Sequence, residues 1–136
     1  MKKLVAIFFT TLLLSGCKKS IQKVEQDLVI QAMTNGQWTI TKFTLNGTNI
    51  TADFSFYKFQ YKSDKTVDAI KSGTVERTGN LDGNATNMTT WANFSAAPNP
   101  IALINGTWNI TKNSWTYVEA SQTNGSEIKT LRLDKL

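Results

Sequence analysis

The sequence predicts an all-β protein made of about eight short strands. From residue 35 onward, asparagine, threonine and aromatic residues are abundant, and the whole chain has 2 prolines. Apolar and polar side chains alternate over short runs, as they do in half-buried strands. Turn dipeptides such as Asn46-Gly47 and Asn124-Gly125 separate these runs at short, regular spacing. This pattern is typical of an antiparallel sandwich or barrel.

The first segment of the chain has the form of a secretory signal. Two lysines precede a mostly apolar run of 11 residues, which Ser15 and Gly16 follow. Small residues at that place are typical of a cleavage site. A membrane-spanning helix needs about 20 residues, so we expect a cleaved signal peptide at residues 1–16.

Leu14-Ser15-Gly16-Cys17 resembles the lipobox of bacterial lipoproteins. The resemblance implies that Cys17, the only cysteine in the chain, receives a diacylglyceryl group and becomes the first residue of the mature protein. Two or three acyl chains hold a protein on a membrane, whereas one chain binds only marginally. The alternative is an ordinary signal peptide in which the cysteine occurs by chance.

The residues after Cys17 bear on where such a lipoprotein is sorted. Lys18 and Lys19 follow it, rather than an aspartate or an acidic cluster. In the lipoproteins that this stretch resembles, aspartate marks retention in the inner membrane, and an acidic cluster marks surface export in some Bacteroidetes. We therefore expect a lipid anchor in the outer membrane of the cell envelope, with the domain on the periplasmic face.

The chain after the signal suits one domain. Removing residues 1–16 leaves 120 residues and lowers the net charge from +5 to +3, because two lysines are lost. No basic cluster is interleaved with aromatic residues, so nucleic acid is not an expected partner. With Cys17 lipidated, no cysteine remains for a disulfide, and an ordinary hydrophobic core must stabilise the domain. We assign residues 17–34 to the lipidated cysteine, a tether and a short helix, and residues 35–136 to the β-domain.

A short helix is predicted before the first strand. Four apolar residues recur on one face at helical spacing: Ile21, Val24, Leu28 and Ala32. Ser20 is a suitable N-cap, and Asn35-Gly36 is a suitable stop. The segment either packs on one end of the β-domain or is a partly ordered tether, and we expect it to pack.

The first predicted strand changes face along its length. Residues 37–41 alternate as a strand does, but the apolar phase then shifts to Phe43 and Leu45. A change of face within one strand predicts a β-bulge. Residues 54–61 form the most regular aromatic run and are the clearest predicted strand.

The later strands have weaker patterns. They are expected at residues 67–70, 74–78, 101–104, 108–110, 115–120 and 128–133. A turn is expected at Asp82-Gly83, and residues 86–94 contain apolar residues without clear alternation.

One short segment occurs twice. Residues 35–42 read Asn-Gly-Gln-Trp-Thr-Ile-Thr-Lys and residues 105–112 read Asn-Gly-Thr-Trp-Asn-Ile-Thr-Lys, so six of eight positions agree. The flanking residues do not match well, which argues against a domain duplication. Each copy turns at Asn-Gly and starts a strand with a tryptophan. We predict that Trp38 and Trp108 are structural and plug one end of a closed sheet.

Gly36-Gln37-Trp38 resembles the Gly-x-Trp opening of lipocalins. With its size, its lipid anchor and a second Gly-x-Trp at residues 106–108, the chain is similar to the lipocalin-like lipoproteins of Bacteroidetes. The resemblance implies an antiparallel up-and-down lipocalin-like barrel of about eight short strands over residues 35–136. It also implies that Arg132, near the last strand, packs across Trp38 through a cation–π contact. The domain is shorter than a typical lipocalin.

Few residues are suited to catalysis. The chain has no histidine, and its one cysteine is expected to be lipidated. This removes the usual general base, the thiol nucleophile and most transition-metal ligands. Five acidic residues near turns or in the last hairpin are interpreted as solvated surface groups: Asp64, Asp68, Glu119, Glu127 and Asp134. We therefore expect no enzyme activity, no cofactor and no metal.

Two functions remain open. An eight-stranded barrel either fills its interior with side chains or holds one small ligand. In the first hypothesis the lipid-anchored barrel binds a small apolar ligand, and five aromatic residues are the candidates for its lining: Tyr57, Phe59, Tyr61, Trp91 and Trp115. In the second, the barrel is solid and ligand-free, and the protein is a structural or interaction lipoprotein with an unknown protein partner. Short strands and many aromatic residues favour a filled interior.

Overall fold

The computed structural model describes residues 30–136. The predicted signal peptide, Cys17, the tether and residues 20–29 of the predicted helix lie outside this part of the chain. Residues 30–34 are helical, in agreement with the last turn of the predicted helix. Strands follow directly.

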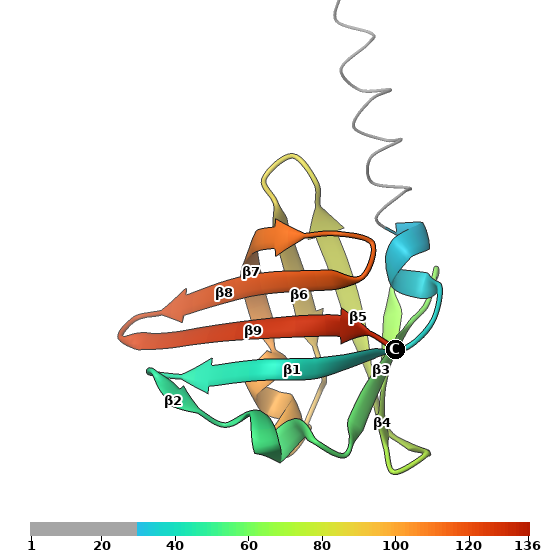
Figure 1. Ribbon diagram of the computed structural model, residues 1–136, viewed down its shortest axis with the longest axis horizontal. Coiled ribbons are helices and arrows are strands. Elements are labelled where there is room, and N and C mark those ends of the chain that lie inside the picture. Colours follow the sequence, from blue (N-terminus) through green and yellow to red (C-terminus); the bar gives the residue numbers. More distant parts are fainter. Residues whose placement is uncertain (1–29) are drawn as a thin grey trace, which may run out of the picture.

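The strands form one antiparallel sheet that closes on itself (Figure 1). They are β1 (Trp38–Leu45), β2 (Thr48–Asn49), β3 (Tyr57–Tyr61), β4 (Thr66–Lys71), β5 (Thr74–Asn84), β6 (Thr89–Asn93), β7 (Gly106–Asn113), β8 (Tyr117–Asn124) and β9 (Glu127–Lys135). Neighbours in the sheet are neighbours in sequence, apart from the short β2 that forms a hairpin on β1, and β1 also pairs with β9. The predicted up-and-down barrel of eight strands is confirmed, with β2 outside the closed ring.

The seam between β1 and β3 is the weakest pairing in the barrel. A single residue pair, Trp38 opposite Phe59, joins these strands, whereas seven pairs join β1 to β9. The two strands are separated in sequence by β2 and by the 3-10 helix η1 (Thr51–Phe54). Closure therefore depends mainly on the long β1–β9 ladder.

The two ends of the barrel differ. One end is covered by η1 and by a second 3-10 helix, η2 (Ile101–Ile104), which joins β6 to β7; we call it the closed end. The opposite end, where β1 begins and β9 finishes, carries the β3–β4, β5–β6 and β7–β8 loops, and we call it the open end. Figure 1 shows residues 30–34 beside the open end.

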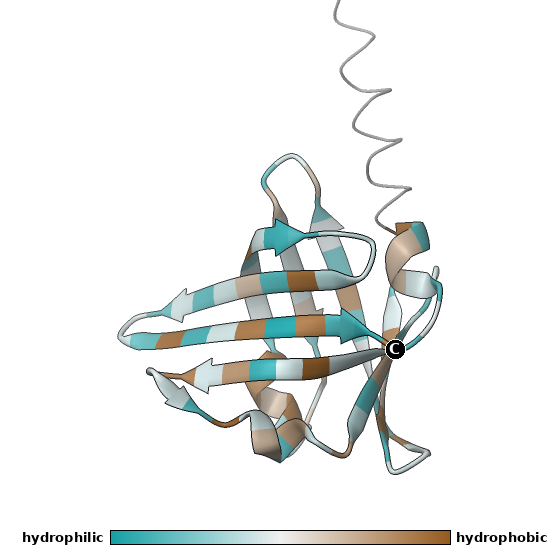
Figure 2. Cartoon of the chain, in the orientation of Figure 1, coloured by the Kyte–Doolittle hydropathy of each residue, from teal (hydrophilic) through white to brown (hydrophobic). Residues whose placement is uncertain are grey.

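Aromatic side chains fill the closed end. The rings of Phe43 and Phe54 stack with centroids 4.7 Å apart, and Trp108 meets Phe43 edge-on at 6.0 Å. Ile101 of η2 is also fully buried in this cluster. Hydropathy alternates along β8 and β9 (Figure 2), as expected for strands with one buried face. The apolar alternation in the sequence thus places the core inside the ring.

The repeated segment folds the same way twice. Gly36 and Gly106 both have positive φ values, of 101° and 108°. The indole Nε1 of Trp38 donates to the Met33 carbonyl at 2.9 Å, and that of Trp108 donates to the Ile104 carbonyl at 2.7 Å. Each copy therefore consists of a helical turn, a glycine and a tryptophan that hydrogen-bonds back to the turn.

Both copies also contain a bulge at the same position. The register of β1 against β9 shifts between Ile40 and Lys42, and that of β7 against β8 shifts between Ile110 and Lys112. The bulge predicted in the first strand is confirmed.

The two tryptophans do not plug the same end of the barrel, so that prediction is wrong. The strands β1 and β7 run in opposite directions because an odd number of antiparallel steps separates them in the ring. Trp108 therefore lies at the closed end and Trp38 at the open end. Both side chains are buried, with exposures of 2% and 0%.

The clearest predicted strand begins later than expected. Phe54 belongs to η1, Phe56 is exposed, and β3 begins at Tyr57. The side chain of Asn49 accepts hydrogen bonds from the Thr51 backbone N–H (3.0 Å) and hydroxyl (2.6 Å). Such a local side-chain bond favours a turn over a strand.

Two further predictions are wrong for identifiable reasons. Residues 101–104 form η2 rather than a strand, with Pro100 as the residue before the helix. Proline has no N–H for a ladder, and its restricted φ suits the start of a helical turn. Asp82 and Gly83 lie within β5, opposite Trp91 and Thr90 of β6, so pairing with the neighbouring strand outweighs the turn preference of Asp-Gly.

Candidate ligand-binding cavity

The open half of the barrel contains a cavity of about 210 Å³. Its wall includes ten buried residues: Ile40, Phe59, Tyr61, Val67, Ala92, Phe94, Trp108, Ala120, Leu131 and Leu133. All but Tyr61 and Trp108 have purely hydrocarbon side chains. The barrel is thus filled at the closed end and hollow towards the open end.

Residues 30–34 form part of the cavity wall near the open end. Ile30, Met33 and Thr34 all line the cavity. The helical turn is held by the indole of Trp38, which donates to the Met33 carbonyl, and by the Asn35 N–H, which donates to the Gln31 carbonyl at 3.1 Å. The prediction that this segment packs on one end of the barrel holds for its described residues.

Charged residues around the cavity are paired with one another. Lys62 Nζ lies 2.7 Å from a carboxylate oxygen of Asp68, and Lys65 Nζ lies 3.1 Å from Asp82. Hydrogen bonds from Lys62 and Thr78 hold the pKa of Asp68 below its usual range. The pKa of Asp82 is lowered by the backbone N–H of Gly83 and then by Lys65. Both lysines in the lining therefore already have carboxylate partners.

Tyr61 is one of the buried residues of the cavity wall that carry a polar group. It ends β3 and is 9% exposed. Burial raises the pKa of its hydroxyl above the usual value for tyrosine, so the side chain is neutral over the physiological range. A neutral hydroxyl both donates and accepts hydrogen bonds.

Two of the five predicted lining residues contact the cavity. Phe59 and Tyr61 line it, but Tyr57 does not. Tyr57 lies at the closed-end start of β3, and its hydroxyl donates to the carboxylate of Glu76. Burial, together with Glu76, raises the pKa of Tyr57 to about 12.

The two predicted tryptophans lie outside the cavity. Trp91 is 42% exposed on β6 because Ala92, the next residue, takes the inward position. Trp115 is 57% exposed in the loop between β7 and β8. Neither ring lines the interior.

Much of the wall consists of aliphatic residues that the sequence analysis did not assign to a site. Leu131 and Leu133 on β9 alternate with polar residues, as do Val118 and Ala120 on β8. This alternation is the sequence signal that these four side chains point into the barrel. No comparable signal marks Ala92, since residues 86–94 lack a regular pattern. Trp108, predicted only as structural, also contributes to the lining.

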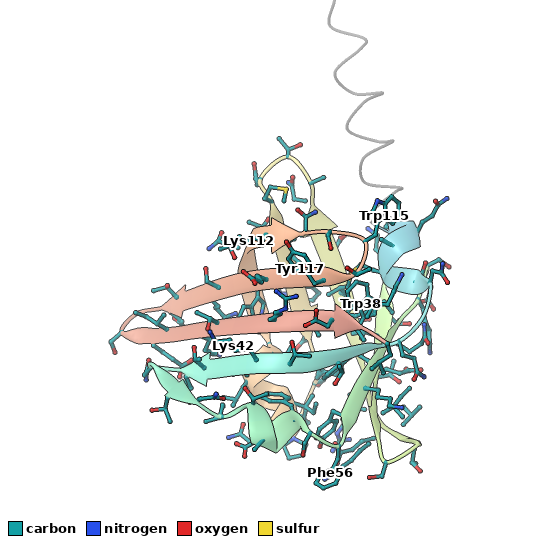
Figure 3. All side chains as sticks on the ribbon, in the orientation of Figure 1. Trp38, Lys42, Phe56, Lys112, Trp115 and Tyr117 are labelled. Carbon is teal, nitrogen blue, oxygen red and sulfur yellow. The ribbon has the colours of Figure 1, made fainter. Side chains whose placement is uncertain are left out.

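Arg132 does not pack across Trp38, so that prediction is wrong. Its guanidinium lies 4.3 Å from the ring centroid of Tyr117, and Lys135 Nζ lies 5.4 Å from that of Trp38. The register explains the exchange, because Lys135 is the residue of β9 opposite Trp38. Figure 3 shows Trp38 and Tyr117 at separate positions on the barrel.

Arg132 instead joins two carboxylates. It lies 2.9 Å from Glu119 and 2.8 Å from Asp134, which occupy β8 and β9. Hydrogen bonds from Arg132 lower the pKa of Asp134. Glu127 pairs with Lys129 at 3.1 Å, so the three acidic residues of the last hairpin do not form one cluster.

The described residues hold neither a metal centre nor a membrane span. Between residues 30 and 136, no three metal-ligating side chains come together. In the same range, no helix is long and apolar enough to cross a membrane.

Comparison with known proteins places the chain by its fold. No protein family matches its sequence, and no curated protein matches it. A DUF4847 family protein from Bacteroides vulgatus is similar in structure, with a TM-score of 0.54, 11% identity, and coverage of 78% of this chain and 96% of that one. Japanin from Rhipicephalus appendiculatus, in its cholesterol-bound form, has a TM-score of 0.53 at 7% identity, with 77% of each chain covered. These likenesses and the closed antiparallel ring of eight strands define a lipocalin-like fold.

Proposed function

We propose that this protein is a lipid-anchored envelope protein whose barrel binds a small apolar ligand. The observation that carries the proposal is the cavity of about 210 Å³ in the open half of the barrel, with a mainly hydrocarbon wall. Japanin, which shares the fold, is bound to cholesterol. Its ligand does not define the ligand of this chain, but it supports apolar binding as a use of this architecture.

The volume limits the size of the ligand. An apolar cavity of about 150 Å³ accommodates benzene, whereas pockets for drug-sized molecules are about 300–1,000 Å³. A cavity of about 210 Å³ lies between these values. It suits a compact apolar molecule or the end of a longer one that extends through the open end.

The proposed anchor joins the barrel at the same end as the cavity. Residue 30 is the first described residue and lines the cavity, and Cys17 precedes it by 13 positions. An extended chain spans at most about 3.6 Å per residue, so lipidated Cys17 would keep the barrel close to the bilayer. We place the domain on the periplasmic face of the outer membrane, where an apolar ligand could exchange with the lipid phase.

The proposal includes no enzyme activity. The acidic residues expected to be surface groups are occupied by basic or hydroxyl partners: Asp64 bonds to Thr66, Asp68 to Lys62, Glu119 and Asp134 to Arg132, and Glu127 to Lys129. A glycosidase needs two carboxylates facing one substrate. The buried residues of the cavity wall offer hydrocarbon surface, one tyrosine hydroxyl and the indole of Trp108 instead.

The test is to fill the cavity. Ala120 is buried in the wall, so Ala120→Leu should reduce the affinity for an apolar fluorescent probe about tenfold or more by occupying the same space. Trp108 lines the cavity, so a change in the protein's tryptophan fluorescence on binding provides a second readout. Ala52→Leu, at an exposed position in η1, is the matched control and should bind like the parent. Absence of binding to the parent, or equal binding by both variants, would contradict the proposal.

A further inference from the structure

Tyr61 contributes a polar side chain to the cavity wall. The side chain lines the cavity and is more than nine-tenths buried. Within residues 30–136, its hydroxyl makes no hydrogen bond. In the same part of the chain, no polar side-chain atom is both fully enclosed and unpaired. The Tyr61 oxygen is therefore not fully enclosed by the protein, and the side chain that carries it lines the cavity.

Several other polar groups of the wall have partners within residues 30–136. Trp108 Nε1 donates to the Ile104 carbonyl, and the Thr34 hydroxyl donates to the Ile30 carbonyl at 2.8 Å. At the edge, the Thr90 hydroxyl donates to the Asp82 carbonyl at 3.0 Å. Among the buried residues of the wall, Tyr61 thus supplies the polar atom that is left for a ligand.

An unpaired hydroxyl discriminates between ligands. A hydrocarbon that fills the cavity removes water from the hydroxyl without replacing its hydrogen bond, and this lowers the affinity. A ligand oxygen at the same place restores the bond. Sites built around such a group reject analogues that lack the matching polar atom.

The charges of the groups around Tyr61 determine whether a charged or a neutral ligand oxygen fits beside it. A buried carboxylate needs a basic partner, but the two lysines of the lining, Lys62 and Lys65, are paired with Asp68 and Asp82. Tyr61 remains protonated because burial raises its pKa. The part of the wall formed by residues 30–136 therefore offers a neutral hydrogen bond and no unpaired positive charge.

We propose that the cavity selects apolar molecules that carry one neutral oxygen, such as the oxygen of an alcohol or a ketone. This oxygen hydrogen-bonds to the Tyr61 hydroxyl. The inference rests on the proposed ligand-binding function. The rest of such a ligand lies against the hydrocarbon wall. Phe59 and Val67, on β3 and the neighbouring β4, contribute to that wall beside Tyr61.

The experiment compares three probes of equal chain length by titration calorimetry: octane, octanol and octanoate. It uses the mature chain from residue 17 to Leu136 with Cys17→Ala, checked for cooperative unfolding. Tyr61→Phe removes the hydroxyl and keeps the ring. Tyr57→Phe is the matched control, because its hydroxyl is on the same strand but bonds to Glu76 and does not line the cavity.

We expect Tyr61→Phe to weaken octanol binding about fivefold, the effect of one neutral hydrogen bond, and to leave octane binding unchanged or stronger. Tyr57→Phe should leave the ratio of the two dissociation constants at the parent value. Octanoate at neutral pH should bind the parent about tenfold more weakly than octanol.

Two results would overturn the inference and leave the proposed function intact. One is binding of octane and octanol with a ratio that Tyr61→Phe does not change. The other is tighter binding of octanoate than of octanol. Failure of all three probes to bind would instead overturn the proposed function, and this inference with it.

Discussion

At the scale of single residues, buried tryptophans connect the helical turns to the barrel. Trp108 is 2% exposed, packs edge-on against Phe43 and hydrogen-bonds to the Ile104 carbonyl. Its indole thus holds η2 over the closed end and forms part of the cavity floor. The burial and hydrogen bonding of this residue make it a structural element as well as a lining residue.

We expect Trp108→Ala to lower the free energy of unfolding by about 3–5 kcal/mol, because it removes a large buried side chain and leaves a void. Urea denaturation followed by circular dichroism measures this change. Trp115→Ala is the control, since Trp115 is 57% exposed, and it should change stability by no more than about 0.5 kcal/mol. Equal effects of the two substitutions would show that Trp108 does not belong to the core.

The sequence identified the structural residues better than the lining residues. Gly-x-Trp motifs indicated Trp38 and Trp108 because tryptophan after a turn usually enters a core. Aromatic character did not distinguish Tyr61, which lines the cavity, from Tyr57, which lies on the same face of β3 nearer the closed end. Depth along the barrel axis separates them, and depth depends on pairing that the local pattern does not specify.

At the scale of elements, each copy of the repeated segment links a helical turn to the start of a strand. The positive φ of Gly36 and Gly106 redirects the chain from a helical turn into β1 or β7. A side chain at such a φ is strained. An added Cβ on Gly106 would also lie 2.5 Å from Nε2 of Gln122, whereas one on Gly36 would lie 3.7 Å from Lys135.

We expect Gly36→Ala and Gly106→Ala to cost roughly 1–3 kcal/mol each from backbone strain. Gly106→Ala should cost more, because Gln122 is buried and its amide donates to the Asn105 and Thr107 carbonyls at 3.1 Å. Thermal unfolding measures both. Gly83→Ala is the control, since its Cβ would meet the nearest atom at 3.5 Å. If Gly83→Ala were as damaging as the other two, backbone geometry would not be the cause.

Local patterns predicted some elements and missed others for physical reasons. The change of apolar phase after Ile40 predicted a bulge, since a bulge is what moves later side chains to the other face. The four residues of η2 are apolar and resemble a strand by composition, but Pro100 and the need to cover the closed end favour a helical turn. Short apolar runs do not separate these two outcomes.

At the scale of the whole molecule, closure of the sheet creates the cavity. The ladder between β1 and β9 joins the first and last strands of the barrel, and the covering helices fill one end of the barrel while the other end remains hollow. About eight antiparallel strands were predictable from turn spacing. The hollow half was not, because several of the aromatic residues that suggested a filled interior lie elsewhere. Phe43 and Phe54 are packed at the closed end, and Trp91 and Trp115 are exposed.

The position of the cavity gives the proposed lipid anchor a role. An apolar molecule dissolves poorly in water, so a carrier gains from staying near a lipid phase. The described chain begins at the open end, and lipidated Cys17 would keep that end within reach of the membrane. Two or more acyl chains are needed for stable attachment.

We therefore expect the protein expressed in a bacterium with an outer membrane to remain in the membrane fraction after washing with high salt, and its mass to include the acyl groups. Cys17→Ala removes the thiol to which the first lipid is attached, so this variant should lack the added mass and leave the membrane fraction. A double variant, Lys18→Ser with Lys19→Ser, is the control for simple charge attraction and should stay with the membrane. Because salt screens charges but does not weaken burial of acyl chains, retention of Cys17→Ala at the parent level and with the parent mass would refute the lipid anchor.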